Sequence, residues 1–128
     1  KKLGVPDVTF GSCPMTEVRV TDPRTGGQKG SKPQRFDLLP WEPIARISEV
    51  YGFGAEKYEA HNWRRGYVWS LSFAALQRHL AAFWGGEDVD PESGLSHLAH
   101  AGFHIFALLE FCGDDRYAEL DDRYRSSA

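Results

Sequence analysis

The sequence predicts an all-α fold, in which an extended N-terminal arm precedes a helical bundle. Apolar residues recur at helical spacing in three segments after residue 40, whereas five of the seven prolines lie within residues 1–40. A hydrophobic content of 41%, with 13% aromatic residues, is enough for a core in a single domain of 128 residues. We therefore expect an arm (1–40), a helical domain that holds the candidate catalytic residues (41–113), and a charged tail or short helix (114–128).

The arm contains one segment with the character of a strand. Residues 16–21 alternate weakly between polar and apolar side chains, and Asp22-Pro23 and Gly26-Gly27 follow as turn signals. These features predict a short strand that closes into a hairpin. The basic stretch from Lys29 to Arg35 is expected to be flexible and to lie over the helical body.

The first two helices are predicted from apolar spacing and from turn residues. One begins near Trp41, where Pro43 suits a first turn. Gly52 and Gly54 weaken or bend it, and residues 56–58 either continue it or begin a new turn. Residues 62–66 have the character of a connection. The second helix spans about 69–83, with Ser70 as its expected N-cap, and the glycines at 85 and 86 end it.

The third helix is expected to begin at Asp90, because aspartate is a favoured N-cap and Pro91 fits the first helical position. It ends near Gly113. Since a short loop joins the second and third helices, we expect them to pack antiparallel.

This packing brings together several groups that bind metals. His97 and His100 are three residues apart and share a helix face, and His79 lies on the facing helix. The same face could hold His104 one turn further along. Glu87 and Asp90 lie in the joining loop. The sequence thus predicts a divalent-metal site for phosphate chemistry, with these ligands: His79, Glu87, Asp90, His97 and His100. The alternative is a stripe of partly buried histidines with satisfied hydrogen bonds, in which Asp90 serves only as a helix cap.

A second cluster suits a nucleotide. Lys57, Asn62, Trp63 and Arg64 combine cations for phosphate, an amide, and an indole for stacking. Lys32 on the arm is a further candidate contact for triphosphate oxygens. In the alternative interpretation Trp63 is a core residue and Lys32 belongs to a solvated basic tail.

Composition excludes some classes of protein. A formal charge of −3 gives no electrostatic signature of nucleic-acid binding, and no apolar run approaches the length of a membrane span. The start at Lys1 is too polar for a signal peptide, so we expect a cytoplasmic protein. Cys13 and Cys112 have no metal-binding spacing and are expected to be free thiols.

Taken together, motifs over about residues 29–112 resemble those of the phage-encoded dATP/dGTP diphosphohydrolases of the MazZ type, within the MazG-like all-α nucleotide pyrophosphatase superfamily. The motifs are these: Lys32-Pro33-x-Arg35-x-Asp37-Leu38-Leu39-Pro40, Gly54-Ala55-x-Lys57-Tyr58, Asn62-Trp63-Arg64, Arg78-His79, and Gly86-Glu87-x-x-Asp90-x-Glu92-Ser93-Gly94-x-x-His97-x-x-His100.

The resemblance implies a MazG-like helical bundle that hydrolyses a purine deoxynucleoside triphosphate to monophosphate and pyrophosphate. It implies Mg²⁺ or Mn²⁺ as cofactor, a homo-oligomer (dimer or tetramer), and a place in the host-cell cytoplasm. The favoured substrate is dGTP, with dATP also possible, and the dGMP formed would feed 2-aminoadenine nucleotide synthesis. In this reaction Glu87 and Asp90 would hold metal, and Arg78, Lys57 or Arg64 would offset charge on the leaving pyrophosphate.

The family pattern of Glu-x-x-Glu on one helix and Glu-x-x-Asp on the next fits this chain in two ways. A literal placement uses Glu56, Glu59, Glu87 and Asp90. A structural placement lays the second and third helices onto the family's helices and puts histidines where the acids would stand. We prefer the structural placement because helix lengths and apolar register agree with it. The rival functions are a non-catalytic sensor of nucleotide or metal, and a phosphohydrolase that cleaves at another position.

Overall fold

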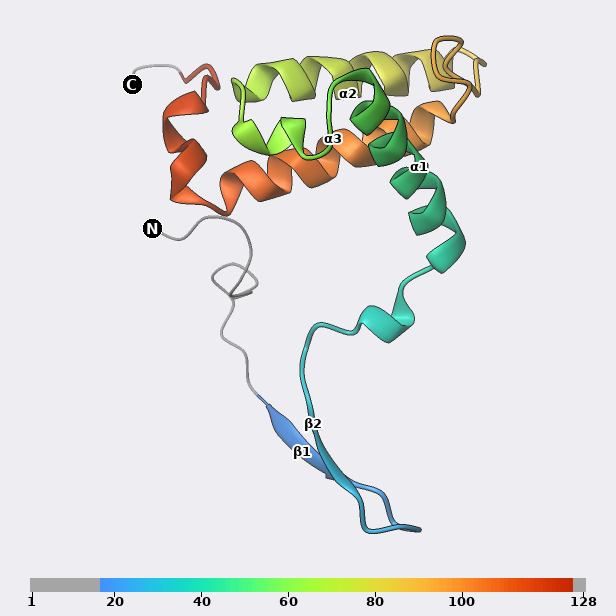
Figure 1. The fold of residues 1–128 in the computed structure, drawn as a ribbon, viewed down its shortest axis with the longest axis vertical. Helices are drawn as coiled ribbons and strands as arrows, with labels where there is room; N and C mark the ends of the chain where they lie inside the picture. Colours follow the sequence, from blue (N-terminus) through green and yellow to red (C-terminus); the bar gives the residue numbers. More distant parts are fainter. Residues whose placement is uncertain (1–16, 126–128) are drawn as a thin grey trace.

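The computed structural model describes residues 17–125 and confirms the predicted all-α fold (Figure 1). Three α-helices form the body: α1 (Trp41–Lys57), α2 (Trp69–Trp84) and α3 (His97–Cys112). The described part also contains these short 3-10 helices: η1 (Phe36–Leu38), η2 (Asn62–Arg65) and η3 (Asp115–Leu120). Strands β1 (Val18–Thr21) and β2 (Gln28–Ser31) complete the described elements.

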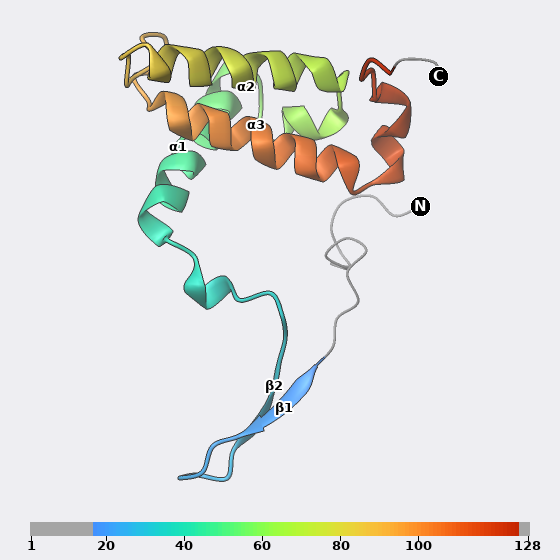
Figure 2. The same cartoon turned by 180° about the vertical axis from the view of Figure 1, so that it is seen from behind.

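Helices α2 and α3 lie side by side and antiparallel, as expected from the short loop between them (Figures 1 and 2). Helix α1 crosses α3, and Gly102 allows this close approach. A Cβ atom at Gly102 would stand 2.6 Å from Cδ1 of Ile47 on α1. The three helices therefore enclose a common interior. The side chains that they direct into it form the candidate site described below.

Helix α3 begins six residues later than the Asp90 cap predicted, since its N-cap is residue 96. The hydroxyl of this N-cap, Ser96, accepts hydrogen bonds from the backbone N–H groups of Leu98 and Ala99. Asp90 instead closes a turn, with its Oδ1 accepting from the N–H of Glu92 at 2.9 Å. The expectation failed because an Asp-Pro pair suits a turn as well as a first helical turn, and Gly94, with a φ of 73°, ends this turn before the helix starts.

Helix α2 ends where expected, with Gly85 as its C-cap, but Ser70 is not its N-cap. The helix starts at Trp69, so Ser70 lies inside its first turn. The carboxylate of Asp122 in the tail accepts from the Ser70 backbone N–H at 2.9 Å and also bonds its hydroxyl. A side chain distant in the sequence thus satisfies the free N–H that a local cap would otherwise take.

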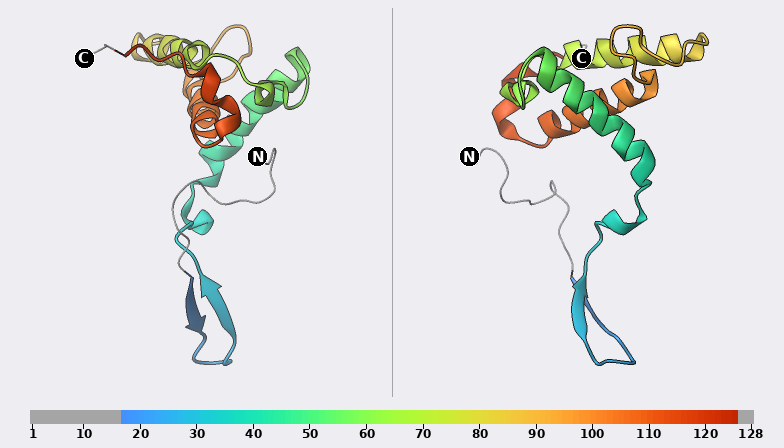
Figure 3. Two further views of the ribbon diagram at one scale, coloured as in Figure 1. Left: turned by 90° about the vertical axis from the view of Figure 1, so that its left-hand side faces the viewer. Right: turned by 45° about the vertical axis from the view of Figure 1, so that its right-hand side comes forward.

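Residues 17–40 of the N-terminal arm contain the predicted hairpin, which does not lie over the body (Figure 3). Strands β1 and β2 pair antiparallel from Val18↔Ser31 to Thr21↔Gln28. In the turn, Oδ1 of Asp22 accepts hydrogen bonds from the backbone of Arg24 and Thr25. Figure 3 shows the hairpin projecting away from the helices, so the basic stretch that begins within β2 does not cover the body.

The core lies at the end of the bundle where η3 closes against α2 and α3. It is built from the buried side chains of Trp69, Ala107, Phe111 and Tyr117. The Tyr117 hydroxyl donates to the backbone carbonyl of Arg64 at 2.6 Å, which fixes η2 against η3. The short helix expected in the tail therefore anchors the connection that carries the predicted nucleotide contacts.

We expect Gly66→Ala to destabilise the protein by about 1–3 kcal/mol. Gly66 has a φ of 92°, and an added Cβ would stand 2.9 Å from both Leu120 Cδ1 and Tyr117 Cδ1. Urea unfolding followed by circular dichroism measures the change. Gly54→Ala in α1 is the control, because no atom lies within 4 Å of its new Cβ. It should leave stability unchanged or raise it by about 0.5–1 kcal/mol; equal losses in both variants would contradict the argument.

Two further sequence expectations have partial answers. No helix in residues 17–125 combines the length and the apolar character that crossing a membrane requires. Cys112 is a free, exposed thiol at the end of α3. Cys13 lies outside the described residues.

Candidate metal and nucleotide site

A pocket of about 870 Å³ lies between the three helices and the connections 58–68 and 85–96. Most of the residues singled out in the sequence line it: Lys57, Asn62, Trp63, Arg64, Arg78, His79, Asp90 and His100. Glu87, His97 and Lys32 are not among its lining residues. The fold thus unites the predicted metal and nucleotide clusters in one cavity.

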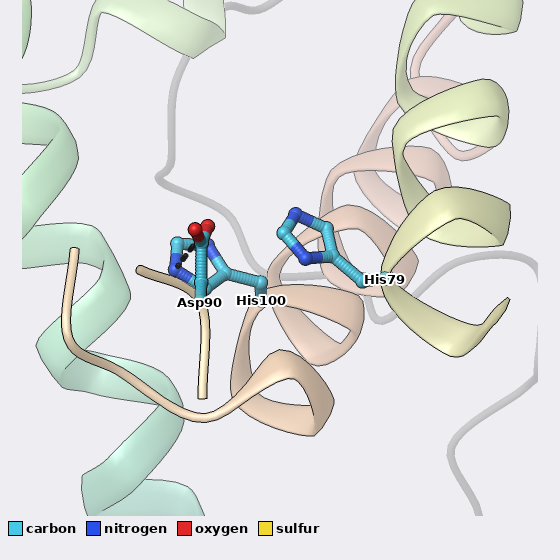
Figure 4. A group of neighbouring side chains, drawn as sticks. All are labelled: His79, Asp90 and His100. Carbon is cyan, nitrogen blue, oxygen red and sulfur yellow. Dashed lines mark ion pairs between the residues drawn. The ribbon is translucent and has the colours of Figure 1, made fainter. Parts of the chain in front are cut away.

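His79, Asp90 and His100 form a compact group of possible ligands at one side of this pocket (Figure 4). Each offers one ligand atom, and these atoms all lie within 4.8 Å of one another. The rings of His79 and His100 stack at 4.6 Å with an angle of 6° between their planes. Nε2 of His100 is 3.6 Å from Oδ2 of Asp90. This group comes from α2, α3 and the loop between them.

Burial prepares both imidazoles to bind a cation. The pKa of His79 lies below its usual value, chiefly because burial penalises the charged ring and also because His100 is near. Burial likewise lowers the pKa of His100, against the opposing effect of the Asp90 carboxylate. Neutral imidazole is the form that ligates metals. Two neutral nitrogens and one carboxylate are a donor set that fits a divalent transition ion such as Mn²⁺ better than Mg²⁺, which prefers oxygen.

A hydrogen-bonded chain stands behind His79. Nε2 of the buried His97 lies 2.7 Å from Oε1 of Glu87, and its Nδ1 lies 2.9 Å from Nδ1 of His79. Because the carboxylate only accepts, we assign the His97 proton to Nε2. His97 Nδ1 then accepts from His79 Nδ1–H, which leaves the His79 Nε2 lone pair available. A carboxylate and a second ring thus set the tautomer of the candidate ligand.

The loop holds Asp90 and His100 in place through local bonds. The Asp90 backbone N–H donates to the carbonyl of Leu95, and its carbonyl accepts from Gly94. The hydroxyl of Ser93 lies 2.7 Å from Nε2 of His100. The loop therefore fixes both residues before any ligand is bound.

The cations of the pocket differ in how firmly they are held. Lys57 pairs with Glu92 at 2.8 Å, and the guanidinium of Arg64 lies 4.7 Å from the Trp63 ring and 3.3 Å from Glu110. Arg78 lines the pocket and has no ion-pair partner within residues 17–125. It is the cation most available to an anionic ligand.

Residues 23–123 match the family model described as "dATP/dGTP diphosphohydrolase, N-terminal". The chain belongs to the dATP/dGTP diphosphohydrolase family. The protein is therefore an enzyme, a nucleoside triphosphate diphosphohydrolase. The family name indicates activity on dATP and dGTP. No curated protein and no solved structure matches the chain.

The structure keeps other predicted site residues of the diphosphohydrolase away from the ligand group. Lys32 pairs with Glu17 at 3.2 Å on the projecting arm. Glu59 reaches the pocket wall but bonds Arg65 at 2.6 Å, and Glu56 is not among the lining residues. Of the four acids of the literal placement, the structure therefore brings Asp90 into the ligand group, but not Glu56 or Glu59.

A second group of polar residues lies in the pocket, and of these the sequence interpretation placed His104 on the face of His97 and His100 but missed Tyr67 and Ser72. Tyr67, Ser72 and His104 all line it and are joined by hydrogen bonds. The spacing contained a usable signal, since Ser72 and His79 are seven residues apart and so share a face of α2. His104 similarly follows His100 by one turn of α3.

The rings of His100 and His104 both stack on that of His79, and we call these three residues the histidine row. Its burial predicts a loss of stability in acid. Burial, with smaller effects of His79, His100 and Arg78, lowers the pKa of His104 from 6.5 to about 4. The unfolded chain therefore takes up a proton at higher pH than the folded protein. Stability present above pH 6.5 should fall as the pH approaches 4. Urea unfolding across this range should show a shallower fall in His104→Gln, whereas His61→Gln, outside the row, should keep the wild-type slope.

Proposed function

We propose that this diphosphohydrolase hydrolyses purine deoxynucleoside triphosphates, dGTP preferentially and dATP as well, to monophosphate and pyrophosphate with Mn²⁺ or Mg²⁺. One observation carries the proposal. The ligand group of His79, Asp90 and His100 lies in the same pocket as the cation Arg78 and the aromatic Trp63. A metal-held triphosphate and a stacked base need these parts in one cavity.

In this proposal, His79, Asp90 and His100 hold the divalent ion, and Glu87 with His97 orients His79. An ion bound there would neutralise charge on phosphate oxygens and would make the attacking water more acidic. The nitrogen content of the ligand set favours Mn²⁺. Glu87 and His97 thus retain a place in the mechanism as supports of a ligand.

The remaining pocket residues bind and orient the substrate. Arg78 and Lys57 offset the charge of the triphosphate, and Arg78 faces the leaving pyrophosphate. Trp63, whose ring is fixed by Arg64, stacks against the base. Glu92, which Lys57 holds on the pocket wall, accepts the proton of the attacking water.

The wider setting of the proposal rests on the motifs described above. We place the enzyme with the MazZ type of the MazG-like superfamily, in a phage that uses 2-aminoadenine, and in the host-cell cytoplasm. Phe73 and Trp84 on α2 and Leu109 on α3 are largely exposed, which supports a dimer or tetramer in which a second copy covers them.

Chromatography of the products tests the reaction. With Mn²⁺, dGTP and dATP should each give the monophosphate and pyrophosphate, dGTP faster, and the two pyrimidine triphosphates should react much more slowly. Release of inorganic phosphate or tripolyphosphate as the first product would refute the cleavage position. Tight binding of dGTP without any product would favour the non-catalytic sensor, and a preference for pyrimidines would refute only the substrate class.

A further inference from the structure

Tyr67, Ser72 and His104 form a hydrogen-bonded relay, which contributes to neither the proposed metal ligands nor the phosphate contacts. The hydroxyls of Tyr67 and Ser72 lie 2.7 Å apart, and Ser72 Oγ is 3.0 Å from Nδ1 of His104. Ser72 is 0% exposed, so water does not compete for its hydroxyl. Both ends of the relay line the pocket.

The relay has one more hydrogen than its internal bonds use. Two hydroxyls and one neutral imidazole carry one polar hydrogen each, and two bonds join the three groups. In one direction Tyr67 donates to Ser72 and Ser72 donates to His104, so His104 presents Nε2–H. In the other direction His104 donates through Nδ1–H and Ser72 donates to Tyr67. The Tyr67 hydroxyl then keeps the unused hydrogen, and Nε2 becomes an acceptor. Reversal moves the imidazole hydrogen between its nitrogens and gains or loses no proton.

His104 is the end of the relay that can meet a base. Its Nε2 has no hydrogen-bond partner within residues 17–125, whereas the single oxygen of Tyr67 already bonds Ser72. The His104 ring lies 5.0 Å from that of Phe103, which in turn lies 6.0 Å from the Trp63 ring. A base stacked beside Trp63 would thus lie in the cavity that His104 also lines.

We propose that this relay lets one pocket accept both a 6-oxo and a 6-amino purine, because His104 Nε2 donates to the first and accepts from the second. Guanine presents an acceptor oxygen at position 6, and adenine presents a donor amino group there. A fixed donor would place an N–H group against the amino group of adenine. A fixed acceptor would place a lone pair against the oxygen of guanine. The inference rests on the proposed function and adds a specificity-determining residue, His104, with Tyr67 and Ser72 as positioning residues.

Nitrogen-15 NMR of the histidine rings tests the relay directly. In the protein saturated with dGMP, His104 should carry its proton on Nε2, and with dAMP it should carry it on Nδ1. The same tautomer with both nucleotides would overturn the proposal.

Tyr67→Phe tests the consequence for specificity. Without the phenol, the buried Ser72 hydroxyl has His104 Nδ1 as its remaining acceptor, so His104 is locked as an Nε2–H donor. The ratio of kcat/KM for dGTP over dATP should rise by roughly tenfold or more, the cost of an unpaired buried group. Adding Ser72→Ala removes the lock and should return the ratio toward the wild-type value. Tyr51→Phe, a pocket tyrosine outside the relay, should leave the ratio unchanged.

The outcomes separate the relay from the reaction. An unchanged ratio in Tyr67→Phe, or a changed ratio that Ser72→Ala does not restore, would overturn the relay while the proposed function stands. If the wild-type protein hydrolyses neither purine triphosphate, the proposed function fails. In that case NMR of free Tyr67→Phe still decides the relay, which requires the Nε2–H tautomer alone.

Discussion

Replacing Asp90 with asparagine should lower the turnover of dGTP by about a thousandfold and abolish Mn²⁺ binding in the pocket. Asp90 is the one carboxylate in the group with His79 and His100, so the change removes the negative charge of the site. Asparagine keeps the shape of the side chain. Its Oδ1 can still accept from the N–H of Glu92, so the turn and the helical fold should persist.

Steady-state kinetics and calorimetric titration with Mn²⁺ measure the two effects. Asp88→Asn is the matched control, because Asp88 is an exposed acid two residues earlier in the same loop and lies outside the ligand group. It should retain wild-type turnover and affinity. Near-normal turnover in Asp90→Asn would remove Asp90 from the mechanism, and equal losses in both variants would indicate only a general dependence on loop charge.

Local signals in the sequence predicted the parts of the fold that local chemistry determines. Gly86, which follows the C-cap of α2 and has a φ of 105°, ends that helix because glycine adopts this backbone conformation readily. Asp22 closes the hairpin turn through its own side chain. The predicted start of α3 was wrong because an Asp-Pro pair, such as Asp90-Pro91, occurs in turns as well as at the beginning of helices. Ser96 was the true cap, and only the pairing of the loop backbone ahead of it decides between the two.

The same distinction holds for the site. Spacing along the helices brought His79 and His100 together correctly, since register within an antiparallel pair follows from helix geometry. It did not reveal that Glu87 bonds His97, which depends on the path of a loop. Ser72 and His104 lie 32 positions apart in the sequence, on two different helices. Contacts of this kind depend on how the helices pack.

A second large effect separates the two placements of the ligands. His79→Ala and His100→Ala should each weaken Mn²⁺ binding by more than about a hundredfold, because each removes a ligand atom from the group. Glu87→Gln should weaken it by roughly 10- to 100-fold, the range for a group that orients a ligand. Glu56→Gln should have little effect, because Glu56 is exposed and lies outside the pocket wall.

Glu59→Gln tests the literal placement most severely, because Glu59 is the one of its two helix acids that reaches the pocket. Its carboxylate bonds Arg65 at 2.6 Å, so the expected loss is limited to that exposed pair. Calorimetry with Mn²⁺ and dGTP turnover should therefore rank the variants with the two histidines lowest, Glu87→Gln between, and Glu56→Gln and Glu59→Gln near the wild type. The reverse order would mean that the acids hold the ion and that the histidines serve as structural residues between α2 and α3.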